Sequence, residues 1–137
     1  MIGKEQMDSL FAEAEKAAAL AYAPYSKFHV GAALLCEDGS VVTGCNVENR
    51  SYGLSICAER GAVMAAIARG KRRFTALAIS TPDSAAPVGP CGACRQVLSE
   101  FMSPDAPVRF SGSGKEQVNA TLGELLPWDS LYDLKKD

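Results

Sequence analysis

The stretch PVGPCGACRQVLSEF, residues 87–101, places two cysteines, Cys91 and Cys94, at the start of an apolar-periodic run that predicts a helix. Because residues three positions apart share a helix face, both thiols can point at one atom. We interpret Pro90 as the first-turn proline that sets the helix start. A C-x-x-C pair can be a redox disulfide, half of a zinc site or two ordinary thiols, so its partners decide what it does.

The candidate partner is Cys57, which opens a second predicted helix. Free N–H groups and the helix dipole lower thiol pKa values at such positions, and thiolates are what zinc binds. No good fourth ligand is found, because Cys36, Cys45 and the single histidine, His29, fall in a predicted hairpin away from the helix starts. Three protein ligands indicate a catalytic zinc site, which keeps a position open for water.

Two charged residues follow Cys57. Glu59 is the candidate catalytic group, although an acid in the first turn of a helix is commonly there to match the dipole. Positions i and i+2 do not face the same way, so this pairing requires Cys57 at the non-helical start. Arg60 is three positions after Cys57 and would offset the excess negative charge of three thiolates; the alternative is a solvated helix arginine.

The rest of the chain predicts alternating elements around one sheet. Pro24 ends the first helix, because the residue before proline avoids the helical region. The predicted helices cover 4–22, 57–69, 91–102 and a short stretch through Leu126 with a capping box at 121–124, and the predicted strands cover 28–36, 41–48, 74–80, 107–111 and 118–120. This order predicts a single domain over 1–137 with a three-layer α/β/α fold and a mixed sheet of about five strands.

Composition excludes several classes of protein. The 137 residues carry a formal net charge of −2, so no basic field would attract nucleic acid. No apolar run approaches the roughly 18 residues of a membrane span, and the N-terminal residues lack the apolar segment of a signal peptide. We therefore expect a cytoplasmic protein with no membrane or nucleic-acid partner, in which five cysteines serve metal binding or catalysis more readily than disulfides.

The two cysteine motifs together resemble a known signature. Cys57-Ala58-Glu59-Arg60 followed by Pro90-Cys91-Gly92-Ala93-Cys94-Arg95-Gln96 resembles the zinc signature of nucleoside and nucleobase deaminases, in its three-cysteine form. The stretches AYAPYSKFHVGAALL (21–35) and GCNVENRSYG (44–53) resemble the short cytidine deaminases that assemble as homotetramers. The resemblance extends from about residue 8 to residue 127.

The resemblance implies a cytidine deaminase-like fold and hydrolytic deamination of cytidine and 2′-deoxycytidine to the uridines, with release of ammonia. One Zn²⁺ per chain would be bound by Cys57, Cys91 and Cys94 and would supply a zinc-bound hydroxide. Glu59 would be the proton shuttle. The physiological role would be pyrimidine salvage, with a pyrimidine nucleoside as the small-molecule partner.

The resemblance also implies roles around the substrate. It assigns Asn46 and Glu48 to the ribose, Phe28 to stacking on the base, the Ala58 backbone to the pyrimidine carbonyl, Arg60 to the zinc thiolates, and Tyr52 and Tyr25 to subunit contacts that complete neighbouring sites in a homotetramer. A carboxylate repels phosphate, so we expect nucleosides to be preferred over nucleotides. By residue type alone, Asn46 and Glu48 suit a polar strand exit, and Phe28 suits a core position.

The chain departs from the family pattern in four places. Gly89 stands where serine is usual, Arg50 replaces a small residue, and Gly61 replaces a threonine. Trp128 and Tyr132 are both candidates for the C-terminal aromatic residue that reaches a neighbouring site.

Three alternatives stay open. A related zinc aminohydrolase could act on another aminopyrimidine nucleoside, such as a nucleoside antibiotic, or on a free base, although Asn46 and Glu48 would then lack a ribose to bind. A redox or structural zinc module would use the C-x-x-C pair without Cys57 or Glu59. A deaminase that edits RNA or DNA should carry a basic groove, which the acidic balance disfavours.

Overall fold

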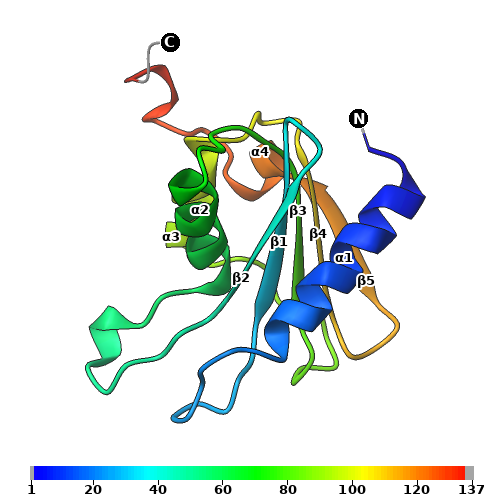
Figure 1. Cartoon of the computed structure of the whole chain (residues 1–137). Coiled ribbons are helices and arrows are strands. Elements are labelled where there is room, and N and C mark those ends of the chain that lie inside the picture. Colours follow the sequence, from blue (N-terminus) through cyan, green and yellow to red (C-terminus); the bar gives the residue numbers. More distant parts are fainter. Residues whose placement is uncertain (1, 135–137) are drawn as a thin grey trace.

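The computed structural model describes residues 2–134, which form a mixed five-stranded sheet with helices on both faces (Figure 1). The strand order is β2-β1-β3-β4-β5, and only the β3–β4 pair is parallel. The strands are β1 (Gly31–Cys36), β2 (Val41–Cys45), β3 (Phe74–Thr81), β4 (Pro107–Gly112) and β5 (Gln117–Thr121). The predicted three-layer architecture with a mixed sheet is confirmed.

Helix α1 (Lys4–Ala18) covers one face of the sheet alone (Figure 1). Its buried residues Met7, Leu10 and Ala14 pack on alanine and leucine side chains of β1 and β3. The backbones approach so closely that a Cβ atom at Gly31 would lie 2.0 Å from the Ala14 carbonyl oxygen. Gly31 therefore fixes the distance between α1 and the centre of the sheet.

Helices α2 (Ala58–Ala68) and α3 (Gly92–Ser99) cover the opposite face, with the short α4 (Leu122–Leu125) near the end of the chain. The larger core cluster lies between these helices and the sheet. A Cβ atom at Gly44 on β2 would lie 2.4 Å from the Ala62 backbone nitrogen, so β2 and α2 are in direct contact. This contact places the start of α2 beside the end of β2.

Two helices are shorter than the sequence predicts. The first ends at Ala18 instead of residue 22, because Tyr22 pairs with Val47 in an isolated bridge and its backbone N–H donates to the Asn46 carbonyl. The third ends at Ser99 instead of residue 102, because buried Met102 pairs with Phe74 at the start of β3. In both cases a β-bridge to a residue distant in sequence ends the helix early.

The hairpin strands are also shorter than predicted. Residues 28–30 and 46–48 are held partly by side-chain hydrogen bonds and do not continue the β1–β2 ladder. The predicted loop after β2 contains a short 3₁₀ turn, Tyr52–Leu54. The predicted capping box is present, with Thr121 and Glu124 bonded reciprocally at the start of α4. Within residues 2–134, none of the helices combines the length and the apolar character needed to span a bilayer.

Candidate metal and active site

Three cysteine sulfur atoms meet where α2 and α3 begin. Cys57 and Cys91 are the N-cap residues of these helices and both have extended backbones, with ψ of 155° and 163°. Cys94 lies in the first turn of α3, and its backbone N–H donates to the Cys91 sulfur over 3.4 Å. The sulfur of Cys91 lies 3.7 Å from that of Cys57 and 3.3 Å from that of Cys94. Two helix starts, distant in sequence, therefore bring three thiols together.

This spacing suits a tetrahedral metal ion. Zinc–sulfur bonds of about 2.3 Å at tetrahedral angles separate the sulfur atoms by about 3.8 Å. The three sulfur atoms all lie within 4.8 Å of one another, close to that geometry. Within the described part of the chain, they are the one group of three or more His, Cys, Asp or Glu ligand atoms this close together. The donor set therefore fits zinc and leaves its fourth position free.

The other candidates for a fourth ligand lie elsewhere. Cys36 is buried in the core, and His29 is partly exposed with its Nδ1 atom 2.7 Å from the Asp83 carboxylate. Cys45 is nearer than the sequence suggested: its carbonyl oxygen would lie 3.4 Å from a Cβ atom at Gly61, in the first turn of α2. Its thiol is nevertheless outside the cluster, and burial raises its pKa.

Neighbouring groups set the ionisation of the cluster. The hydrogen bond with Cys94 lowers the pKa of the Cys57 thiol to about 5, and the Arg60 guanidinium also lowers it. The same hydrogen bond, followed by burial, raises the pKa of Cys94. The neighbouring groups therefore favour the thiolate form of Cys57, and metal binding would displace the protons that remain on the cluster.

Glu59 is a carboxyl group buried beside these thiols, with 4% of the residue exposed. Glu59 can lie close to the cysteine cluster only if Cys57 is at the non-helical start of α2. Cys57 is the N-cap residue and has an extended backbone, as this requires. Burial raises the pKa of Glu59, and the negative charge of Cys57 raises it further. A carboxyl group with a raised pKa can both take and return a proton near neutral pH.

Arg60 belongs to the cluster and not to a solvated helix face. Its Nη2 atom donates to the Cys57 sulfur over 3.4 Å, and the hydrogen bonds to Cys57 and Cys94 raise the pKa of the guanidinium. Its Nε atom is buried and has no hydrogen-bond partner among the described residues. The guanidinium therefore places a positive charge against the sulfur atoms.

Arg95 is a site residue whose role is not evident from the sequence. Its Nε atom donates to the Pro90 carbonyl over 2.7 Å, and its Nη1 atom donates to the Leu125 carbonyl over 2.9 Å. It thereby ties the turn that carries Cys91 to α4. A Cβ atom at Gly89 would lie 3.3 Å from the Arg95 Nη2 atom, so the glycine fits tightly here. The only sequence signal was the position of Arg95 one turn after Cys91.

The two residues expected at a ribose also hold the loop that carries Phe28. The Asn46 side chain accepts from the Val30 N–H and donates to the Phe28 carbonyl, both over 2.8 Å. Glu48 accepts from the backbone N–H groups of Tyr25 and Ser26, over 3.0 and 3.1 Å. The Ser26 hydroxyl also donates to Glu48 and, ahead of the backbone N–H groups, lowers the pKa of its carboxyl group. Sequence reasoning did not predict this network.

The remaining predicted residues are dispersed. Ala58 is fully buried at the first position of α2, next to Glu59. Tyr52 is 84% exposed on the 3₁₀ turn, and Tyr25 is exposed on the loop before Phe28. Trp128 is 98% exposed. None of these three aromatic side chains is buried within the described chain.

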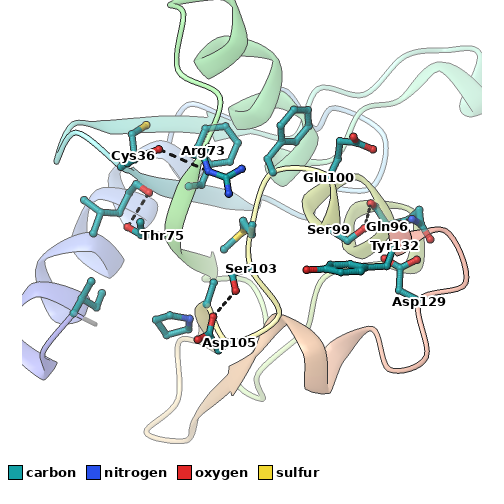
Figure 2. A pocket seen from close by; sticks show the side chains of 18 of the residues that line it. Cys36, Arg73, Thr75, Gln96, Ser99, Glu100, Ser103, Asp105, Asp129 and Tyr132 are labelled. Atoms are coloured by element: carbon teal, nitrogen blue, oxygen red, sulfur yellow. Dashed lines mark hydrogen bonds and ion pairs between the residues drawn. The ribbon is translucent and has the colours of Figure 1, made fainter. Parts of the chain in front are cut away.

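A separate hollow of about 1060 Å³ lies away from the thiols. Figure 2 shows it between the ends of β1 and β3, the C-terminal part of α3 and Tyr132 near the end of the described chain. Its lining includes Arg73, Thr75 and Ser99 but neither Glu59 nor a cysteine of the cluster. Tyr132 therefore belongs to the lining of this hollow. Size alone does not identify the chemical site.

Comparison with known proteins agrees with this geometry. The model of a family described as "cytidine and deoxycytidylate deaminase zinc-binding region" matches residues 4–108. A cytidine deaminase of Sporosarcina psychrophila is 48% identical over 121 residues, which are 88% of each chain. A cytidine deaminase of Halalkalibacterium halodurans is also 48% identical, over 86% of this chain and 89% of that protein. The crystal structure of a Burkholderia pseudomallei cytidine deaminase is 46% identical with a TM-score of 0.84, over 88% of this chain and 96% of that one.

A protein with a different name is less similar. A blasticidin-S deaminase of Bacillus cereus is 33% identical over 74% of this chain and 76% of that protein.

Proposed function

The chain belongs to the cytidine and deoxycytidylate deaminase family, and we propose that it catalyses the hydrolytic deamination of cytidine to uridine with release of ammonia. The observation that carries this function is the meeting of three cysteine sulfur atoms beside the buried carboxyl group of Glu59. Relatives with 48% identity over most of the chain are named cytidine deaminases. 2′-Deoxycytidine is proposed as a second substrate.

The three cysteines and Glu59 have separate roles in the proposed reaction. One zinc ion per chain, held by Cys57, Cys91 and Cys94, would supply the Lewis acidity that makes a water molecule nucleophilic at neutral pH. Glu59 takes a proton from the attacking water and gives it to N3, so that C4 becomes electrophilic. As the C4–N4 bond breaks, Glu59 carries a second proton to the departing amino group, which leaves as ammonia.

Arg60 keeps the thiolates from neutralising that Lewis acidity. Three thiolates and one Zn²⁺ carry a net charge of −1, which opposes ionisation of the water. The Arg60 guanidinium, which donates to Cys57, withdraws charge from the sulfur atom. Its place beside Cys57 and Cys94 supports this role.

The substrate contacts are proposed from the loop network. The Asn46 amide keeps one N–H free after its bond to Phe28, and the Glu48 carboxylate keeps free lone pairs, so both can meet ribose hydroxyl groups. Phe28 would stack on the base, and the Ala58 backbone N–H, at the free start of α2, would donate to the pyrimidine carbonyl. The Glu48 charge favours nucleosides over nucleotides.

A homotetramer is proposed as the working assembly. Exposed apolar side chains gather on the segments around the loop and the 3₁₀ turn, namely Tyr22, Tyr25, Val47, Tyr52 and Leu54. Such a cluster suits a protein interface, at which Tyr52 and Tyr25 would complete a neighbouring site. Light scattering with size-exclusion chromatography tests the assembly by giving the mass of the particle.

The cellular setting is proposed from the chemistry. All five cysteines are free, which suits a reducing compartment such as the cytoplasm. Conversion of cytidine to uridine would serve pyrimidine salvage. All five strands belong to one sheet, which supports a single domain over residues 1–137.

A substrate panel separates the proposed function from its alternative. Ammonia release is measured with cytidine, 2′-deoxycytidine, cytosine and an aminopyrimidine nucleoside antibiotic at equal concentrations. We expect the two nucleosides to be deaminated fastest and cytosine slowest, because a free base leaves Asn46 and Glu48 without a sugar. Faster turnover of the antibiotic would instead favour a blasticidin-type substrate, as in the 33% identical relative.

A further inference from the structure

The Ser26 side chain joins two groups that the proposed function places on opposite parts of the substrate. Its hydroxyl donates to the Glu48 carboxylate and accepts from the Phe28 backbone N–H, over 3.0 Å for the latter. Glu48 is the proposed sugar acceptor, and Phe28 carries the proposed base-stacking ring. One oxygen atom therefore links sugar recognition to base placement.

The backbone between these groups has a conformation that needs support. Lys27 has φ of 62°, in the left-handed region that residues other than glycine and asparagine rarely adopt. Its backbone N–H donates to the Ala23 carbonyl over 3.0 Å. The hydrogen bond from the Phe28 N–H to the Ser26 hydroxyl spans this residue, and the bond from Ser26 to Glu48 ties the turn to the segment after β2, so both help to hold the loop.

Glu48 both anchors the loop and is the proposed acceptor for the sugar. Its Oε1 atom already accepts from the backbone N–H groups of Tyr25 and Ser26, so the carboxylate is a loop anchor as well as a sugar acceptor. Loss of the Ser26 hydroxyl leaves Oε2 free to rotate away from its place and leaves the Phe28 N–H without an acceptor. Glu48 and Phe28 would then lose their fixed relation without any change in either residue.

We propose that Ser26 is a positioning residue that couples recognition of the sugar hydroxyls to the placement of Phe28. The proposal rests on the proposed function, because it takes Glu48 and Phe28 as substrate contacts. Binding energy from the sugar is then used to hold the base at the reacting centre, which is how remote contacts raise kcat. Ser26 itself does not touch the reacting atoms.

The test compares Ser26→Ala with the unaltered protein on two substrates, cytidine and 2′,3′-dideoxycytidine, which lacks the 2′- and 3′-hydroxyls and keeps only the 5′-hydroxyl. Loss of a hydrogen bond to a charged group typically lowers an equilibrium or rate constant by about ten- to a hundredfold. We expect kcat/KM for cytidine to fall by about that factor, with dideoxycytidine affected much less. The readout is the ratio of kcat/KM for cytidine to kcat/KM for dideoxycytidine, because general loosening of the fold lowers both kcat/KM values together.

Two serine variants serve as controls. Ser40→Ala removes a similar bond, from the Ser40 hydroxyl to Asp38 over 2.6 Å, in the turn between β1 and β2. It should leave the ratio unchanged. Ser26→Thr keeps a hydroxyl group and should restore most of the ratio. Zinc content and Tm, measured for each variant, show that the metal site and the fold are intact.

A second pair of variants keeps the proposal testable if Ser26→Ala does not fold. Lys27→Val places a β-branched residue at φ of 62° and should reduce the substrate ratio, whereas Lys27→Gly fits that backbone and should retain it. An unchanged ratio in Ser26→Ala, or in Lys27→Val where that variant is used, overturns the coupling. Failure of the unaltered protein to deaminate cytidine overturns the proposed function instead, and the two failures are thus distinct.

Discussion

The sulfur atoms of Cys57 and Cys91 lie 3.7 Å apart although 34 positions separate the two residues in the sequence. Helices α2 and α3 lie side by side on one face of the sheet, and each begins with one of these cysteines (Figure 1). The extended backbones of both N-cap residues turn their thiols to a common point, which Cys94 joins from the first turn of α3. A metal ion bound there would link the two helix starts.

Removal of one thiol should remove the metal. Cys57→Ala leaves two sulfur ligands, so we expect zinc to fall from about one ion per chain to a small fraction of that, with activity lost in parallel. Cys45→Ala is the matched control, because this free thiol lies outside the cluster. Elemental analysis of the purified proteins gives the result. Full zinc content in Cys57→Ala would support the structural zinc alternative, and an absence of zinc from the unaltered protein would support the redox one.

Glu59 is expected to govern turnover and not metal content. Glu59→Gln keeps the size of the side chain but cannot carry a proton, so kcat should fall by at least about 10²- to 10⁴-fold while zinc and substrate still bind. Glu5→Gln, an exposed acid in the first turn of α1, provides a control for the loss of one charge near a helix start. Steady-state kinetics measure the effect. Substantial residual kcat in Glu59→Gln would remove this residue from the mechanism.

Arg60 should affect activity through the sulfur atoms. Arg60→Gln removes the positive charge 3.4 Å from the Cys57 sulfur, and we expect a loss of about 10- to 100-fold in activity or zinc affinity, as is typical for groups that hold metal ligands. Arg69→Gln, at the C-cap of the same helix, should be nearly neutral. Equal activity of the two variants would show that Arg60 is an ordinary helix arginine.

The contact between α1 and the sheet should depend on pH. The hydrogen bond from Arg109 holds the pKa of Asp8 below its ordinary value of 3.8, with Lys4 as the second cause. Such a carboxylate stabilises the fold above pH 3.8, and this stabilisation is lost as pH falls through the lowered pKa. Asp8→Asn should therefore lower Tm at pH 7 and approach the unaltered protein at acidic pH.

Thermal unfolding at several pH values measures this difference, with Glu13→Gln as the control. Glu13 lies on the same helix and pairs only with exposed Lys16, whereas the Arg109 side chain at Asp8 is buried. A constant difference in Tm between Asp8→Asn and the unaltered protein at every pH would contradict the assigned cause.

The charge of Glu48 should discriminate against phosphate. We expect kcat/KM for cytidine monophosphate to be well below that for cytidine, since a carboxylate near the sugar repels the phosphate group. Glu48→Gln removes this charge and should reduce the difference in kcat/KM between cytidine and cytidine monophosphate. It also loosens the loop at Tyr25 and Ser26. Comparable efficiency of the two substrates in the unaltered protein would contradict this interpretation.

Local sequence patterns predicted much of the site. The i, i+3 spacing of Cys91 and Cys94 and the helix-start position of Cys57 are local signals, and these thiols meet in the structure. The strand and helix order followed from periodicity, and the sheet agrees with it. These features depend on residues close together in the chain, which is why the sequence alone indicated them.

What the sequence did not predict depends on distant partners. Helix α1 stops at Ala18 because Tyr22 pairs with Val47, and neither residue carries a local breaking signal for that end. Arg95 reaches the Leu125 carbonyl, 30 positions away, and Ser26 reaches Glu48, 22 positions away. Such contacts follow from the packing of α3 on α4 and of the loop on the end of β2.

We propose that a zinc ion at the three thiols, with Glu59, converts cytidine to uridine. The most direct measurement follows the ultraviolet absorbance change of this conversion before treatment with a metal chelator, after it, and after zinc is restored. We expect turnover that is lost with the metal and returns with zinc. Turnover that persists in the demetallated protein, or no turnover in the zinc-loaded protein, would contradict the proposal.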